Sequence, residues 1–107
     1  MNKYQNKKTI IDGIKFDSKK EAKEYLKLKK MEENGEIENL RLQVPYLLLP
    51  SQKGKKRTER PVKYIADFVF IKDGEEIVLD TKGMRTADYI IKRKLMKYIH
   101  NIEIEEV

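Results

Sequence analysis

The sequence contains no cysteine and a single histidine, His100. Neither a disulfide framework nor a thiolate metal site is therefore available, and a reducing compartment is compatible with the chain. One imidazole also disfavours zinc sites with several histidine ligands and a Ser-His-Asp relay backed by a second histidine. Chemistry that depends on thiols or on groups of imidazoles is accordingly not expected.

Long hydrophobic runs are missing as well. No apolar run follows the lysines of residues 1–8, and no stretch approaches the length needed to span a membrane. We therefore expect a soluble, cytoplasmic protein with no membrane partner. The 107 residues, 39% of them hydrophobic, suffice for one modest core. A single domain over residues 1–107 is predicted, with residues 1–8 as a flexible basic tail.

Charge is abundant and unevenly distributed. The net charge is +6, and residues 51–63 and 82–98 each hold six basic side chains and one acidic side chain. Between them, residues 64–81 hold one basic and five acidic side chains. An acidic segment flanked by basic ones suits a site that binds divalent cations while it grips a polyanion. An ordinary surface of solvated lysines is the alternative.

The first half of the chain predicts a hairpin, a helix and a strand. Residues 9–16 form the hairpin, turned at Asp12-Gly13. Ser18 and Glu21 fit a capping box at the start of a helix that ends near Gly35. A strand pattern covers residues 36–49, and residues 50–61 read as an exposed basic loop between two prolines.

The second half predicts two strands, a helix and a last strand. Residues 62–71 are largely apolar on both faces, with residues 62, 64, 66, 68 and 70 on one face and Asp67 in the middle of the other. A turn at residues 72–75 leads into a strand over residues 76–82. A helix follows over residues 86–100, before a short strand at residues 102–104. Its expected core-facing stripe is Ile91, Leu95, Tyr98 and Ile99. This order predicts an α/β fold with helices packed on a small sheet.

Two aspartates are expected to face each other in that sheet. A two-residue turn at Asp73-Gly74 pairs residues whose numbers sum to 147, which places Asp67 opposite Asp80 with Cβ atoms roughly 5 Å apart. Lys82 lies on the same face as Asp80. Opposed carboxylates need a cation or a raised pKa, and Mg²⁺ prefers such oxygen ligands. Alternatively, Lys82 and other bases neutralise the pair near a frayed sheet end.

Three other polar residues have two interpretations each. Glu21 falls inside the apolar stripe of the first helix, so it is either a third carboxylate of the site or only the capping partner of Ser18. Lys92 falls between Met96 and Ile99 on the second helix and is either functional or a lysine with a buried stem. Gln43 positions water or phosphate, or is a neutral residue near a strand turn.

These residues resemble the PD-(D/E)XK superfamily of metal-dependent nucleases. The matching segments are Asp67 in YIADFVF, Asp80-Thr81-Lys82 in IVLDTKG and Glu21 in FDSKKEAKEY, with Ala66 where the motif has proline. The resemblance covers residues 18–106 and implies a restriction-endonuclease-like core of helix, three strands, helix and strand behind the N-terminal hairpin. The strings DGIKFDSKKEA, KYIADF and DTKG are also similar to a family of small phage-encoded proteins, which implies a phage or prophage product in a bacterial host.

The resemblance implies the chemistry. Asp67, Asp80, the Thr81 carbonyl and Glu21 would hold Mg²⁺, with Mn²⁺ as a substitute, and Lys82 would orient or deprotonate the attacking water. Gln43 and Lys92 are accessory candidates. Independently of the resemblance, the charge of the basic loop makes it the candidate for contacts with the DNA backbone, through Lys53, Lys55, Lys56, Arg57 and Arg60. An ordinary solvated loop is the alternative.

The predicted function is a Mg²⁺-dependent DNA endonuclease, selective for structures such as junctions or recombination intermediates. A DNA-binding accessory protein that cleaves nothing and a protein-interaction domain are the alternatives. The choices between DNA and RNA and between monomer and homodimer stay open.

Overall fold

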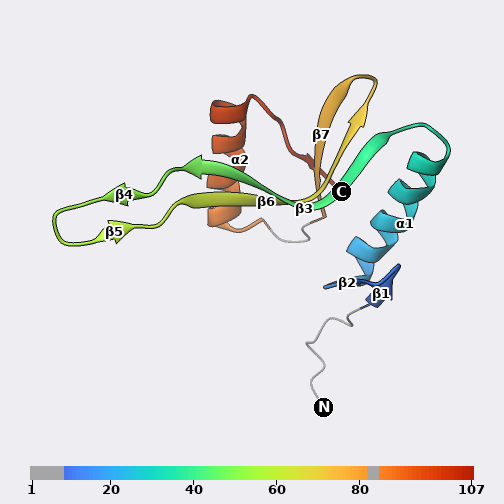
Figure 1. Ribbon diagram of the computed structural model, residues 1–107, viewed down its shortest axis with the longest axis horizontal. Helices are drawn as coiled ribbons and strands as arrows, with labels where there is room; N and C mark the ends of the chain where they lie inside the picture. The colour runs from blue at the N-terminus through green and yellow to red at the C-terminus, as the bar shows by residue number, and fades with distance from the viewer. Residues whose placement is uncertain (1–8, 82–84) are drawn as a thin grey trace, which may run out of the picture.

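The computed structural model describes residues 9–81 and 85–107. The proposed tail over residues 1–8 and the candidate Lys82 lie outside the described residues. The elements in chain order (Figure 1) are β1 Thr9–Ile11, β2 Ile14–Phe16, α1 Lys19–Glu33, β3 Glu38–Leu49, β4 Gln52–Lys53, β5 Thr58–Glu59, β6 Val62–Lys72, β7 Glu75–Asp80, α2 Ala87–His100 and β8 Glu105–Glu106.

The main sheet has four strands in the order β3-β6-β7-β8. The β3–β6 and β6–β7 pairs are antiparallel, whereas β8 lies parallel to β7. The chain is therefore of the mixed α/β class, as predicted. None of the helices in residues 9–81 and 85–107 is long and apolar enough to cross a membrane.

Local signals in the sequence are confirmed. Asp12 and Gly13 have φ values of 54° and 76°, and Asp73 and Gly74 have 52° and 80°, which is the left-handed geometry of two-residue hairpin turns. The second turn sets the predicted register, since Phe68 pairs with Leu79.

Two clusters of buried side chains pack on the sheet. The α1 cluster includes Phe68, Phe70 and Leu79 of the sheet, whereas the α2 cluster includes Val69 and Val78. Because adjacent residues of a strand point to opposite faces, α1 and α2 cover opposite faces at this level of the sheet. Both faces of β6 are consequently buried here, as its apolar sequence predicted.

The faces of the β3–β6 ribbon do not follow simple alternation. Ala66 belongs to the α2 cluster and Phe68 to the α1 cluster, although the predicted pattern places them on one face. Their partners Val44 and Leu42 divide in the same way. Between these pairs, Gln43 has a left-handed φ of 53° inside β3. Next to Asp67, the side chains of the ribbon therefore switch from one face of the sheet to the other. The prediction that residues 62, 64, 66, 68 and 70 share one face is wrong.

The predicted core stripe of α2 is mostly wrong. Tyr89 and Met96 are the buried residues, whereas Ile91, Tyr98 and Ile99 are 57%, 87% and 43% exposed. Leu95 alone of the predicted set packs against the α2 cluster. The helix is turned so that Tyr89, whose hydroxyl has a partner on β8, faces inward.

Two further segments differ from expectation. The basic segment forms the two-stranded β4–β5 ribbon, with Gln52 paired to Glu59 and Lys53 to Thr58, instead of an irregular loop. The last strand falls at Glu105–Glu106, beyond the apolar residues of the predicted strand. Backbone pairing with β7 decides both its position and its length.

Candidate active site

Asp67 is held in place by Thr81, which follows the last residue of β7. Asp67 Oδ2 accepts hydrogen bonds from Thr81 N at 2.9 Å and from Thr81 Oγ1 at 2.8 Å. Thr81 is only 8% exposed, so these bonds compete little with water. The sequence predicted Thr81 as a carbonyl ligand only, and the spacing gave no signal that its hydroxyl and N–H orient Asp67.

Glu21 approaches Asp67 from the first turn of α1. Gln43 Nε2 lies 3.5 Å from Glu21 Oε2 and 3.4 Å from Asp67 Oδ1. One amide group therefore lies between two carboxylates that come from different elements. Gln43 is also the residue with the left-handed φ inside β3. Its backbone conformation, which is sparsely populated for residues other than glycine, therefore sets the direction of its side chain.

The pKa of Glu21 is raised from 4.5 to about 7. Partial burial is the largest cause, followed by the charge of Asp67 and a hydrogen bond shared with that carboxyl, while a backbone hydrogen bond from Asp17 acts in the opposite direction. Glu21 therefore takes up or releases a proton near neutral pH. A positive charge between the two carboxylates would favour the release.

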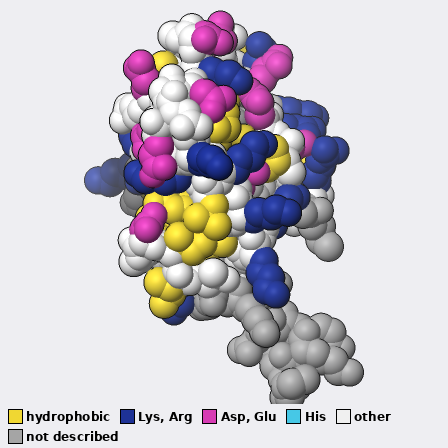
Figure 2. Space-filling model, turned by 90° about the vertical axis from the view of Figure 1, so that its right-hand side faces the viewer, with side chains coloured by type: hydrophobic (Ala, Val, Ile, Leu, Met, Phe, Trp, Pro, Cys, Tyr) yellow, Lys and Arg dark blue, Asp and Glu magenta, His cyan; other side chains and the backbone are white. Residues whose placement is uncertain are grey.

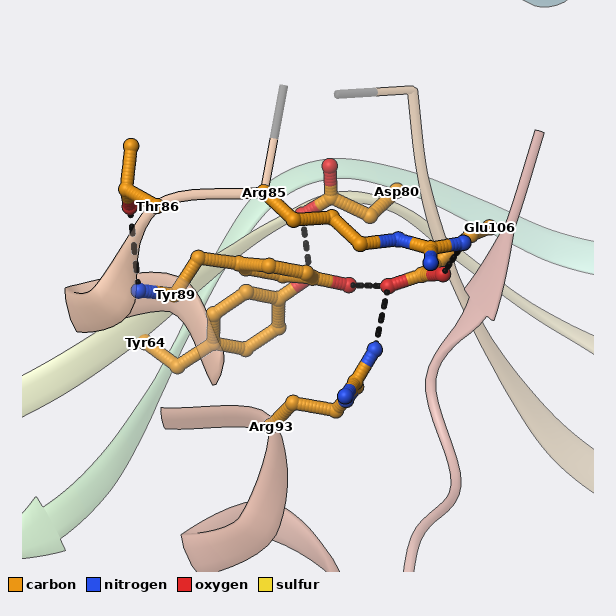
Figure 3. A network of polar contacts seen from close by, with 7 residues as sticks. All are labelled: Tyr64, Asp80, Arg85, Thr86, Tyr89, Arg93 and Glu106. Carbon is orange, nitrogen blue, oxygen red and sulfur yellow. Dashed lines mark hydrogen bonds and ion pairs between the residues drawn. The ribbon is translucent and has the colours of Figure 1, made fainter. Parts of the chain in front are cut away.

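Asp80 is the last residue of β7 and is fully buried. Its Oδ2 accepts a hydrogen bond of 2.6 Å from the Tyr64 hydroxyl (Figure 3). Burial, the hydrogen bond to Asp80 and the Asp80 charge raise the pKa of Tyr64. The Phe68–Leu79 pair has the predicted register, in which Asp67 and Asp80 come next. The face-to-face arrangement of their two carboxylates stays a prediction.

A second polar network joins α2 to β8 beside Asp80 (Figure 3). Glu106 accepts a hydrogen bond of 2.5 Å from the Tyr89 hydroxyl and forms ion pairs with Arg85 at 2.7 Å and Arg93 at 3.2 Å. These contacts lower the pKa of Glu106. Thr86 begins α2 by accepting from Tyr89 N at 3.2 Å. The network fixes the helix to the sheet edge.

The comparisons with known proteins assign a family. A family model described as "Protein of unknown function (DUF1064)" matches residues 1–105. The chain belongs to the DUF1064 family. No curated protein and no solved structure matched it.

The remaining candidates of this DUF1064 chain are dispersed. Lys92 lines an open cavity of about 310 Å³ between α2 and β6, together with Tyr64, Tyr89 and Asp88. The five cations proposed for DNA contact all lie in the exposed segment 51–60, away from both helices (Figure 1). No group of three carboxylate or histidine side chains in residues 9–81 and 85–107 could hold a metal ion. The structure thus brings together Glu21, Gln43 and Asp67, whereas Asp80 is hydrogen-bonded to Tyr64 and Lys92 lines the cavity beside Tyr64 and Tyr89.

Proposed function

We propose that this protein is a Mg²⁺-dependent DNA endonuclease that hydrolyses phosphodiester bonds, with a restriction-endonuclease-like core. The observation that carries the proposal is the pair Glu21 and Asp67, drawn from α1 and β6, with Gln43 Nε2 within 3.5 Å of both. A strained strand residue and a carboxyl with a pKa of about 7 are typical of functional sites.

The donor set fits a hard divalent cation. Glu21 Oε2 and Asp67 Oδ1 both face the amide N–H groups of Gln43, whose hydrogens have a partial positive charge. The two carboxylate oxygens therefore already point toward one electropositive group. Mg²⁺ is commonly held by one or two carboxylates, with waters and substrate phosphate as further ligands. When bound, it would lower the pKa of a water molecule and neutralise phosphate charge.

The protein residues would divide the remaining work. Thr81 orients Asp67 through two hydrogen bonds. The Gln43 amide donates to a phosphate oxygen or to water once a cation takes its place between the carboxylates. Glu21 releases its proton near neutral pH. The role of Lys82 as the base that orients water rests on the resemblance to PD-(D/E)XK nucleases alone.

Asp80 would take part only after a rearrangement, because its side chain is fully buried and a hydrated cation does not reach it. This observation favours the second candidate, a DNA-binding accessory protein of the same fold that cleaves nothing. The cytoplasmic location, the phage or prophage origin, the preference for branched DNA and a homodimer belong to the proposal as expectations from sequence.

Cleavage assays separate the two candidates. Labelled duplex, single-stranded and four-way-junction DNA would be incubated with the protein and Mg²⁺, Mn²⁺, Ca²⁺ or EDTA. We expect strand scission with Mg²⁺ and Mn²⁺ and binding without efficient cutting with Ca²⁺. Asp67→Asn should abolish scission but retain binding, whereas Glu33→Gln, a charge change elsewhere on α1, should leave both scission and binding unchanged. DNA binding with no scission in any metal would establish the accessory protein.

A further inference from the structure

The β4–β5 ribbon is an arm that extends beyond the body of the protein (Figure 1). Every residue in segment 51–60 is exposed, and its two strands are joined by the pairs Gln52–Glu59 and Lys53–Thr58. No residue of this segment belongs to either buried cluster of the described chain. An isolated two-stranded hairpin is at best marginally stable in water, so the arm contributes little to the stability of the fold.

The arm carries almost exclusively positive charge. Segment 51–60 holds five basic side chains and one acidic side chain, Glu59. No carboxylate in the part of the chain that the structure describes forms an ion pair with any of the five. By contrast, lysines and acidic side chains are intermixed on the face that holds α1 (Figure 2). The arm therefore offers unpaired cations to a polyanion.

The shape of the arm selects among nucleic acids. A two-stranded ribbon fits the major groove of undistorted B-DNA, which is roughly 12 Å wide, whereas the minor groove of about 6 Å accepts strands only when the duplex is bent or widened. The arm contains no aromatic side chain on which unpaired bases could stack. Duplex DNA with the ribbon in its major groove is the partner that these features favour.

The chain between the arm and Asp67 limits their separation to about one turn of a duplex. Lys56, near the tip, precedes Asp67 by eleven residues in the sequence. At a rise of about 3.3 Å per residue, the tip lies at most about 36 Å from Asp67. One helical turn of B-DNA measures about 34 Å.

We propose that the β4–β5 arm lies in the major groove of duplex DNA, within about one helical turn of a phosphate that would be bound through a divalent cation at Glu21 and Asp67. The proposal rests on the nuclease function for the position of that phosphate. It specifies the substrate further: the DNA between the cut and the arm is double-stranded.

The test compares two triple variants that each remove three lysine or arginine charges. The arm variant is K55A/K56A/R57A, and the control is K23A/K27A/K30A on the exposed side of α1. Affinity is measured in EDTA, which prevents cleavage, for a duplex with ordinary cytosine and for the same duplex with glucosylated 5-hydroxymethylcytosine. The glucose groups fill the major groove and leave the minor groove open.

We expect the wild-type protein and the control to bind the glucosylated duplex at least about tenfold more weakly, since a groove contact is lost. The arm variant should bind both duplexes equally. Its slope of log affinity against log salt should fall by roughly two to three units. An arm variant that still discriminates between the duplexes, a wild-type protein displaced by the minor-groove ligand netropsin, or no binding to duplex would each overturn the proposal.

Two further outcomes separate the arm proposal from the nuclease function and from self-association of the chain. A wild-type protein that discriminates between the duplexes but cuts nothing with Mg²⁺ refutes the nuclease and leaves the arm contact standing. A change of sedimentation coefficient in the arm variant, with DNA binding unaltered, would mean that the arm binds a second copy of the chain and not DNA.

Discussion

Glu21 serves the start of α1 and the acidic pair through different atoms. Its backbone N–H donates to Ser18 Oγ at 3.1 Å, so the N-cap half of the predicted capping box is present. Its carboxylate lies near Gln43 and Asp67. The two interpretations that the sequence left open are therefore compatible, because capping by Ser18 uses the main chain of Glu21 and leaves its side chain available.

The raised pKa of Glu21 has a defined effect on stability. The folded state binds the proton more tightly than the unfolded state, in which the pKa is near 4.5. This contribution to stability is fully present below about pH 4.5 and is lost as the pH rises through about 7. In EDTA, we expect the Tm of the wild-type protein to fall relative to that of Glu21→Gln between about pH 5 and 8.

Scanning calorimetry at a series of pH values measures this difference, with Glu33→Gln as the matched control on the same helix. Added Mg²⁺ should raise the Tm of the wild-type protein more at pH 8 than at pH 5, because cation and proton compete for the same carboxylates. A constant difference between wild type and Glu21→Gln across the range would contradict the raised pKa of Glu21.

Asp80 and Tyr64 form a buried pair whose two polar groups depend on each other. Asp80→Ala removes the acceptor of the Tyr64 hydroxyl, and an unsatisfied buried donor costs about 1–3 kcal/mol. Relief of repulsion between Asp67 and Asp80, which the predicted pairing implied, would have the opposite sign. We therefore expect Asp80→Ala to lower the free energy of unfolding, measured by urea denaturation.

The double variant Tyr64→Phe/Asp80→Ala provides the control for that pair. Removing both hydrogen-bond partners leaves neither group buried alone, so the double variant should lose less stability than the sum of the two single variants. Strictly additive losses would mean that the hydrogen bond between Tyr64 and Asp80 contributes nothing.

At the scale of the elements, local signals predicted most of the fold. The turns at Asp12-Gly13 and Asp73-Gly74 and the cap at Ser18 depend on residues within a few positions of one another, and each is found. The rotation of α2 depends on Tyr89 reaching Glu106, which is seventeen residues away. The spacing of apolar residues in the helix contains no information about such a distant contact. Ile91, Tyr98 and Ile99 therefore have the spacing of a core-facing stripe but lie on the exposed side of the helix.

The rotation of α2 is testable with two truncations on the same helix. Met96 is fully buried, so Met96→Ala should cost about 2–5 kcal/mol of unfolding free energy. Tyr98 is 87% exposed, and Tyr98→Ala should change stability by no more than about 0.5 kcal/mol. Urea denaturation of both variants decides between the two orientations, because the predicted stripe would make Tyr98→Ala the more damaging change.

The candidate site was predictable where it follows from strand and helix periodicity. Glu21 and Asp67 were singled out as acidic residues at positions flanked by apolar ones, whereas Gln43 was an accessory candidate of the resemblance. The three side chains do converge. The change of faces of the β3–β6 ribbon beside Gln43 was not predictable. A left-handed φ at a glutamine inside a strand has no signature in the sequence.

For the whole molecule, β6 is the element that both clusters share. Phe68 contributes to the α1 cluster and Val69 to the α2 cluster, and both are fully buried. Loss of packing in either cluster therefore loosens the same strand. The arm over residues 51–60 lies outside both clusters and has only two pairs of strand residues.

We accordingly expect one cooperative unfolding transition for the body and independent opening of the arm. Leu28→Ala in the α1 cluster and Met96→Ala in the α2 cluster should each accelerate global amide exchange in both halves of β6, since the two clusters unfold together. Amides of the arm should exchange far faster than those of β6 in the wild-type protein and should not respond to either substitution. Hydrogen-exchange mass spectrometry resolves these segments. If Leu28→Ala accelerated exchange only around α1 and left residues 62–66 protected, the two clusters would be separate folding units and the shared strand would not couple them.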